Sequence, residues 1–352
     1  MTDVDLRKLL IDAGAHPLEV SRAEAEGPGA LRAYAFERLM FPGERRTPVD
    51  VWESTGFDPD FGRALWRAMG FAAIPDDTPA LTDADLDALG HLQQLLELGI
   101  DEDQVLRMTR LIGQAMARIS DALISQFRDA LAAEPPDAAA TDVDALIPLG
   151  GLALGPALDA EVTYLLHRHL VDAVRRQLQT AEDGTPTRII AVGFADLVDF
   201  TEVSQRIDEG ELQALVDGFE STTSAIVTGV DGQVVKLIGD AVLFTTDDPA
   251  AAVDVALALT DAFSDRNVPD VRVGVAYGPV LVHQGDVFGP VVNLASRAVN
   301  VATPGSVLVD EATAEALGDA VDLRVSPIRS RNLKGIGRTK LYRVRHSTGI
   351  KR

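Results

Sequence analysis

The chain has 352 residues, enough for two domains that each bury a core, and 46% of its residues are apolar, as in ordinary globular proteins. It contains no cysteine, which excludes disulfide frameworks, thiolate zinc sites and cysteine nucleophiles and predicts a reducing, cytoplasmic location. Its net charge of −22 disfavours nucleic acid and anionic membrane surfaces as partners.

The first half of the chain shows helical periodicity and no alternating, strand-like runs. Residues 1–187 are also the more acidic half, with 16 Lys and Arg against 32 Asp and Glu. No basic segment followed by an apolar run begins the chain, so a secretory signal is not expected. The uncharged stretch over 145–158 is too short to span a bilayer, and stable membrane insertion is not expected. Apolar spacings of three to four predict helices over Leu6–Ala13, Leu31–Met40, Ala88–Leu98, Asp103–Leu131 and Asp159–Leu178.

Two segments without this periodicity divide the chain. Residues 132–142 are rich in proline and alanine and predict an internal linker, and residues 181–187 separate the two halves. We therefore expect an all-helical domain over residues 1–180, ending in a linker helix over 159–178, and a second domain over 188–346.

The second half mixes strand and helix patterns. Its apolar runs predict strands over Arg188–Phe194, Val230–Thr246 (two strands in a hairpin at Gly239 and Asp240), Val271–Val282 (two strands around Tyr277 and Gly278) and Lys340–Val344. Helices are predicted over Asp208–Thr228, Ala250–Phe263, Val291–Val301 and Glu311–Leu317. The order β-α-β-β-α-β predicts an α+β, ferredoxin-like sheet with helices on one face.

Two aspartates of this half lie where strands end. Asp196 follows the first apolar strand, and Asp240 lies in the hairpin turn, which can bring the two carboxylates together. Paired carboxylates that share a site with substrate phosphates favour magnesium. Taken singly, the two residues are read more readily as an ordinary strand-end aspartate and an ordinary turn aspartate than as metal ligands.

Three motifs together resemble the signature of class III nucleotidyl cyclases. They are Phe194–Leu197 (FADL), Lys236–Asp240 (KLIGD) and Asp286–Arg297 (DVFGPVVNLASR), within a match that covers about residues 188–345. The resemblance implies a class III cyclase catalytic domain that converts ATP to cyclic AMP and pyrophosphate.

The resemblance also assigns roles to residues. Asp196 and Asp240 would hold two metal ions, Mg²⁺ or Mn²⁺, beside the ribose 3′-hydroxyl and the phosphates. Lys236 and Asp286 resemble the pair that reads adenine, which implies a preference for ATP over GTP.

Four more residues match positions of the family. Asn293 and Arg297, spaced i and i+4, would orient the ribose and stabilise the transition state, whereas without the Asp286 motif they read as an ordinary exposed helix face. Arg272 and Lys334 match phosphate-binding positions. The chain departs from the family at Asp199, where glycine is common, so a degenerate domain that binds nucleotide without turnover is the alternative.

The resemblance implies a homodimer, because the family builds each site from two chains. The helical half resembles the regulatory domain of soluble actinobacterial cyclases, some of which respond to pH or lipids, and so implies a proton or lipid effector. Residues 47–70 resemble a helix-turn-helix, but the acidity of this half argues against a DNA-binding regulator. His167 and His169 are candidate pH sensors in the linker helix, or simply two exposed helix histidines.

Overall fold

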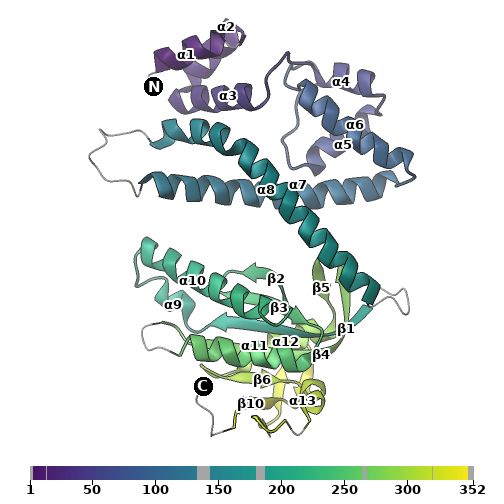
Figure 1. Cartoon of the computed structure of the whole chain (residues 1–352), viewed down its shortest axis with the longest axis vertical. Helices are drawn as coiled ribbons and strands as arrows, with labels where there is room; N and C mark the ends of the chain where they lie inside the picture. Colours follow the sequence, from purple (N-terminus) through teal and green to yellow (C-terminus); the bar gives the residue numbers. More distant parts are fainter. Residues whose placement is uncertain are drawn as a thin grey trace. The chain divides into compact units, whose positions relative to one another are not determined.

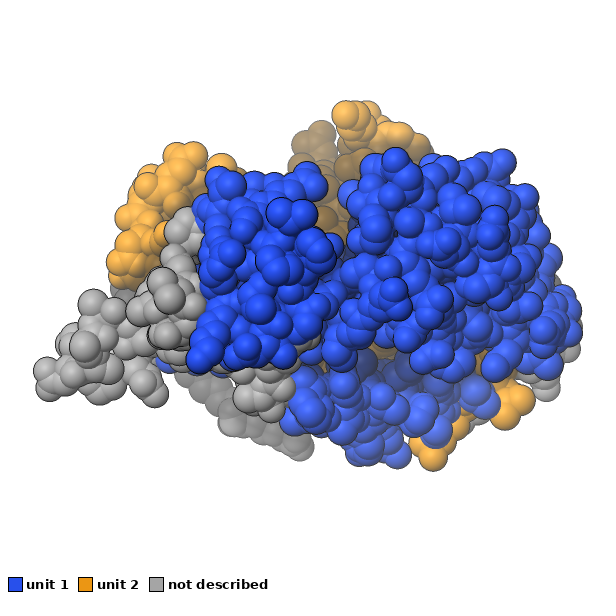
Figure 2. Space-filling model, turned by 90° about the horizontal axis from the view of Figure 1, so that it is seen from above, with its two compact units in different colours: residues 1–174 blue, residues 175–352 orange. Residues whose placement is uncertain are grey.

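The computed structural model describes residues 3–12, 14–132, 143–179, 187–264, 268–318 and 320–347 (Figure 1). The chain divides into two compact units, residues 1–174 and 175–352, which Figure 2 colours separately. Most of both expected linkers, residues 133–142 and 181–186, lies outside the described residues. In the part of the chain that is described, no helix is both long and apolar enough to cross a membrane.

The first unit is helical, as its periodicity predicts. Its helices are α1 (Asp3–Asp12), α2 (Pro17–Glu26), α3 (Pro28–Met40), α4 (Pro48–Thr55), α5 (Pro59–Ala68), α6 (Asp83–Glu97), α7 (Glu102–Ala132) and α8 (Val143–Gln179), which continues into the second unit. Helix α2 was not predicted because only Val20 and Ala23 are buried in it, too few for a periodic pattern. The linker helix expected over 159–178 is the C-terminal part of α8, since the helix continues through Pro156.

Helices α4 and α5 form the helix-turn-helix expected over 47–70. Thr47 and Asp50 cap α4 reciprocally: the Thr47 hydroxyl accepts from the Asp50 amide, and the Asp50 carboxylate accepts from the Thr47 amide. The helix ends at Gly56 in the left-handed conformation, and the Asp58 carboxylate then caps α5. A core cluster that includes Val51, Trp52 and Leu65 packs these helices together with α6 and α7.

The second unit contains a mixed sheet. Its strands are β1 (Thr187–Leu197), β2 (Gln233–Ile238), β3 (Ala241–Thr246), β4 (Val271–His283), β5 (Asp286–Phe288), β6 (Val307–Val309), β7 (Leu323–Pro327), β8 (Arg331–Leu333), β9 (Gly337–Thr339) and β10 (Tyr342–His346). Its helices are α9 (Phe200–Val203), α10 (Glu209–Thr228), α11 (Pro249–Ala262), α12 (Pro290–Val301) and α13 (Glu311–Leu317). The strand order is β2-β3-β1-β4-β6-β10-β7, with β5 paired to β4 and β8–β9 as a separate hairpin. Only β4 and β6 pair in parallel among the described strands.

Helices cover both faces of this sheet, so the expectation of helices on one face is wrong. Ala191 and Ala195 of β1 pack with α10, α11 and α13, whereas Val192 and Phe194 pack with α12. The physical reason is that β1 is apolar at consecutive positions, which requires cover on both sides. Figure 1 shows α10 and α11 lying along the sheet.

A glycine of β4 lets α12 approach the second face closely. A Cβ atom at Gly274 would lie 2.4 Å from the amide nitrogen of Val299 and 2.6 Å from the carbonyl oxygen of Ala295. Such distances are far inside van der Waals contact, so the helix could not pack here against any other residue type. Gly274 therefore fixes the position of α12 on the sheet.

The segment Val271–Val282, expected as two strands, belongs to one strand, β4. Its ladder with β1 continues through the supposed turn, since Ala191 pairs with Tyr277 and Ile190 with Gly278. The turn comes later, at Gln284 and Gly285, whose φ angles are 52° and 76°. Two consecutive residues with positive φ form the kind of hairpin turn that suits the twist of paired strands. The glycine at 278 instead gives room to Val291, whose Cγ2 would lie 3.0 Å from an added Cβ.

Candidate active site

The hairpin and the first strand bring Asp196 and Asp240 to one end of the sheet. Asp196 pairs in register with Ala241, the residue after Asp240, and the Leu197 amide donates to the Asp240 carbonyl oxygen at 3.1 Å. Burial raises the pKa of the Asp196 carboxyl; the neighbouring Arg272 opposes that shift, and the Asp240 carboxylate adds to it. The two aspartates therefore form one electrostatically coupled pair.

Arg272 lies directly across from Asp196 on β4. Its Nε and Nη2 atoms donate to the same oxygen, Oδ2 of Asp196, at 2.7 and 2.5 Å. The side chains are largely covered, with 27% of Arg272 and 16% of Asp196 exposed. The sequence assigned these residues separately to phosphate and metal; their direct pairing follows only from the strand register.

The carboxylate pair suits a magnesium-type ion. Such ions take one or two protein carboxylates and complete their shell with water and substrate phosphates. Among the described residues no group of three or more His, Cys, Asp and Glu side chains is placed to hold a metal by itself. Asp196 and Asp240 therefore fit ions that arrive with phosphate oxygens, and not a closed structural metal centre.

Lys236 and Asp286 form a second pair, contributed by β2 and by the start of β5. The Lys236 Nζ atom lies 2.5 Å from Oδ2 of Asp286, while Oδ1 accepts from the Val287 amide at 2.8 Å. Both side chains remain partly exposed, at 41% and 28%. An ammonium donor beside a carboxylate acceptor can pair with the acceptor N1 and the donor N6 on the edge of adenine.

Asn293 and Arg297 are exposed on α12, one turn apart. They lie away from the carboxylate pair, because α12 runs antiparallel to β4, with Val299 against Gly274 and Val291 against Gly278. Arg272 lies two residues beyond Gly274, roughly 7 Å along the strand. Asn293 lies six residues before Val299, about 9 Å along the helix in the other direction. Within one chain these residues are thus separated by about 16 Å along the sheet.

The remaining expected residues are less closely tied to these pairs. Lys334 is exposed in the turn between β8 and β9. Asp199 has φ 56° and ψ 24°, the left-handed conformation that glycine adopts freely and aspartate tolerates. His167 and His169 are exposed on α8, in the first unit.

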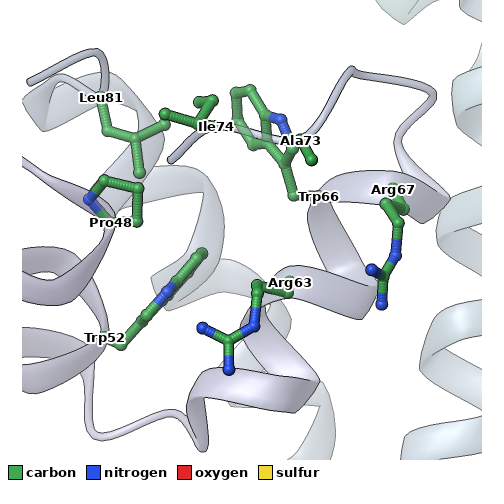
Figure 3. Close-up of a pocket in the computed structure, with 8 residues that line it drawn as sticks. All are labelled: Pro48, Trp52, Arg63, Trp66, Arg67, Ala73, Ile74 and Leu81. Atoms are coloured by element: carbon green, nitrogen blue, oxygen red, sulfur yellow. The ribbon is translucent and has the colours of Figure 1, made fainter. Parts of the chain in front are cut away.

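The first unit contains a pocket that the sequence did not predict (Figure 3). It is lined by Pro48, Trp52, Arg63, Trp66, Arg67, Ala73, Ile74 and Leu81. Its cavity of about 30 Å³ has room for about two water molecules. Arg63 is paired with Asp60 and Asp76, so little of its charge is left for a ligand. A cavity of this size is too small for the acyl chain of a lipid effector.

Two protein families match the chain, and their boundaries agree with its division into two units. Residues 183–346 match the adenylate and guanylate cyclase catalytic domain, and residues 6–174 match the adenylate cyclase regulatory domain. Sheet, helices and motifs define the class of the second unit as a class III cyclase catalytic domain.

Curated relatives of the chain are named adenylate cyclases, which is narrower than the combined adenylate and guanylate cyclase domain. An adenylate cyclase of Streptomyces coelicolor is 40% identical over 305 residues, covering 86% of this chain and 78% of the relative. A pH-sensitive adenylate cyclase of Mycobacterium tuberculosis is 32% identical over 310 residues, covering 84% and 77%. The adenylyl cyclase CyaB of P. aeruginosa, a solved structure, is 21% identical with a TM-score of 0.42, covering 46% of this chain and 96% of that one. The chain belongs to the adenylate cyclase family.

Proposed function

We propose that the chain converts ATP to 3′,5′-cyclic AMP and pyrophosphate, as the names of its relatives suggest. The observation that carries this proposal is the contact between Lys236 and Asp286. A donor and an acceptor held side by side match the N1 and N6 edge of adenine. Guanine presents a donor and a carbonyl acceptor on the corresponding edge and would leave both side chains wrongly paired, which strongly disfavours GTP.

In the reaction, the ribose 3′-oxygen attacks the α-phosphorus and loses its proton to solvent. A new bond from phosphorus to the 3′-oxygen forms as the bond to the β-phosphate oxygen breaks, and pyrophosphate leaves with that electron pair. Arg297 stabilises the charge on the transition state, and Asn293 orients the ribose. Arg272 and Lys334 bind the departing phosphates.

Asp196 and Asp240 are proposed to hold the divalent ions, two Mg²⁺ or Mn²⁺ per site. When bound, such ions supply neutralisation of phosphate charge and a lower pKa for the attacking hydroxyl. The two carboxylates position them, and a bound divalent ion would relieve the repulsion by which the Asp240 carboxylate raises the pKa of Asp196.

Each site is proposed to use two copies of the chain. Asn293 and the Asp196 carboxylate lie about 16 Å apart along one chain's sheet, further than one nucleotide's reacting atoms can bridge. A symmetric homodimer solves this, because the carboxylate pair of one subunit can face Asn293 and Arg297 of the other. Two equivalent sites result.

We infer that residues 1–180 regulate a catalytic domain over 188–346 in a cytoplasmic enzyme. His167 and His169 are the candidate proton sensors, since histidine titrates near neutral pH. A lipid effector would require the pocket beside Trp52 and Trp66 to enlarge. The pH sensitivity in the name of the mycobacterial relative supports testing the proton first.

The test is a cyclic AMP assay of the full chain with ATP or GTP and either Mg²⁺ or Mn²⁺. We expect cyclic AMP from ATP, little cyclic GMP, and a loss of at least about a thousandfold in Asp196→Ala and Asp240→Ala. A control variant, Asp247→Ala, removes a carboxylate that pairs with Arg188 away from the site and should retain activity. No product from the wild-type chain with either metal would support the degenerate alternative, in which case nucleotide binding without turnover should remain.

A further inference from the structure

Arg272 holds one of the two oxygens of the Asp196 carboxylate, which is proposed to bind a metal ion. Both of its hydrogen bonds go to Oδ2 of Asp196, at 2.7 and 2.5 Å. Charge-assisted bonds of this length are among the strongest side-chain contacts in proteins. The positive charge beside the Asp196 carboxylate is therefore supplied by the protein itself, through Arg272.

Two other arginine pairs of this unit differ from this one. Arg188 makes one contact with Asp247, whose side chain is 66% exposed, and Arg206 pairs with Glu202 where both are about two-thirds exposed or more. Exposed pairs exchange readily with water and contribute little. The pair of Arg272 and Asp196 is mostly covered, so removing the guanidinium would leave a poorly solvated carboxylate.

A divalent ion and the Arg272 guanidinium would compete for the Asp196 carboxylate. Ligation of the metal by Oδ2 requires both hydrogen bonds from Arg272 to break or move, since the same lone pairs serve both. A guanidinium left next to a divalent ion would also be repelled by it. The triphosphate of a nucleotide offers Arg272 another set of charged oxygens. The planar guanidinium group binds phosphate oxygens well, because two of its N–H groups can donate to them side by side.

We propose that Arg272 acts as an internal cation that occupies Asp196 until nucleotide arrives, and so makes metal binding depend on nucleotide binding. This inference rests on the proposed function, which identifies the nucleotide as ATP. Nucleotide phosphates would draw Arg272 away from the Asp196 carboxylate, and a divalent ion held by that carboxylate would leave Arg272 free to bind the phosphates. Because such coupling is reciprocal, each ligand raises the affinity of the other by the same factor. Without nucleotide, the chain would therefore bind divalent metal ions only weakly.

The experiment measures Mn²⁺ binding to the full chain at pH 7.5 by electron paramagnetic resonance, first without nucleotide. We expect weak binding by the wild type and binding at least about tenfold tighter by Arg272→Gln, which removes the competing charge. Arg272→Lys keeps a charge with a single point of contact and should fall between them. Arg188→Gln is the matched control and should bind Mn²⁺ as the wild type does.

A second series adds 3′-deoxy-ATP, which lacks the attacking hydroxyl, with a protein-free titration to subtract the metal bound by the analogue. The analogue should tighten Mn²⁺ binding by a factor at least about threefold larger in the wild type than in Arg272→Gln, where the phosphate oxygens still bind the metal but no competing guanidinium is displaced. Nucleotide-free binding by Arg272→Gln that is equal to or weaker than that of the wild type would overturn the inference, provided that circular dichroism shows the variant folded. A chain that failed to cyclise ATP but showed the nucleotide-free gain would remove the proposed function and leave the competition intact.

Discussion

Lys236 and Asp286 are fifty residues apart in the chain, and their charged atoms lie 2.5 Å from each other. Lys236 belongs to β2, the first strand of the hairpin whose turn carries Asp240, and Asp286 follows the tight turn after β4. The contact therefore depends on two separate hairpins being placed correctly. It also leaves both side chains partly exposed, where the edge of a base can reach them.

This contact predicts the base preference of the enzyme. Asp286→Asn exchanges a carboxylate acceptor for an amide and should lower kcat/KM for ATP by about tenfold to a hundredfold, because one base contact weakens. Lys236→Gln should have a similar effect. Steady-state kinetics with ATP and GTP provide the measurement, with Lys340→Gln, a lysine paired to Glu311 outside the site, as the control. Equal use of ATP and GTP by the wild type would show that these residues do not read the base.

The separation of Asn293 from Asp240 predicts recovery of activity on mixing. Asp240→Ala and Asn293→Ala chains should each be inactive, because each homodimer carries the lesion in both sites. A heterodimer of the two places both lesions in one site and none in the other, and should recover up to about half of the wild-type activity per dimer. The measurement is cyclic AMP production by differently tagged chains purified together. Proven heterodimers without recovery would mean that both residues act within one chain.

The close approach of α12 to Gly274 predicts how a larger side chain at this position affects the stability of the second unit. Gly274→Ala would push the helix that carries Asn293 and Arg297 away from the sheet and should destabilise the second unit by about 1–3 kcal/mol. Gly218→Ala is the matched control: Gly218 lies in α10 with open space around it and should gain about 0.5–1 kcal/mol. Thermal unfolding by circular dichroism gives the comparison. Both tryptophans, Trp52 and Trp66, lie in the first unit, and their fluorescence should not change.

Asp310 predicts a pH dependence of stability in the second unit. Its carboxylate is 6% exposed and accepts from the amides of Thr313 and Tyr277, at 2.9 and 3.3 Å. Burial raises its pKa, and these hydrogen bonds offset the shift only in part. A folded state with a raised pKa binds more protons than the unfolded state, so this contribution to stability is complete below the ordinary pKa of aspartate. It is lost as pH rises through the folded pKa.

The variant Asp310→Asn keeps an acceptor oxygen for both amides and cannot ionise. Its free energy of opening, measured by hydrogen exchange in β4 and α13, should lack this loss of stability as the pH rises above the ordinary pKa of aspartate, about 4. The wild type should show it. Parallel curves for the two proteins over that range would show that Asp310 titrates equally in the folded and unfolded states.

His167 and His169 predict the pH dependence of activity. If protonation on α8 biases the catalytic dimer, replacing both with glutamine should flatten the profile of kcat between pH 5.5 and 8. His91→Gln, an exposed histidine of α6, is the control and should leave the profile unchanged. A profile that survives the double replacement would place the sensor elsewhere.

The sequence was sufficient for features that depend on local chemistry. The turn at Gly239 and Asp240, the spacing of Asn293 and Arg297, and most helices follow from glycine positions and apolar periodicity. It could not show that Tyr277 and Gly278 continue a strand, because a Tyr-Gly step resembles a turn until its partner in β1 is known. The pairing of Arg272 with Asp196 was hidden for the same reason: it depends on the register of strands 76 residues apart.

The unbroken strand β4 has a mechanical consequence. Arg272, near the start of β4, donates hydrogen bonds to Asp196. His283, at the end of β4, precedes the turn that leads to Asp286. If the metal-binding and purine-reading residues of each proposed site come from opposite subunits, as the resemblance to class III cyclases implies, this one strand joins a residue at the phosphate end of one site to a residue at the purine end of the other. In a symmetric dimer, a small tilt of this strand would displace a contact in each of the two sites at once. Both sites would then be assembled or disrupted together by a single movement.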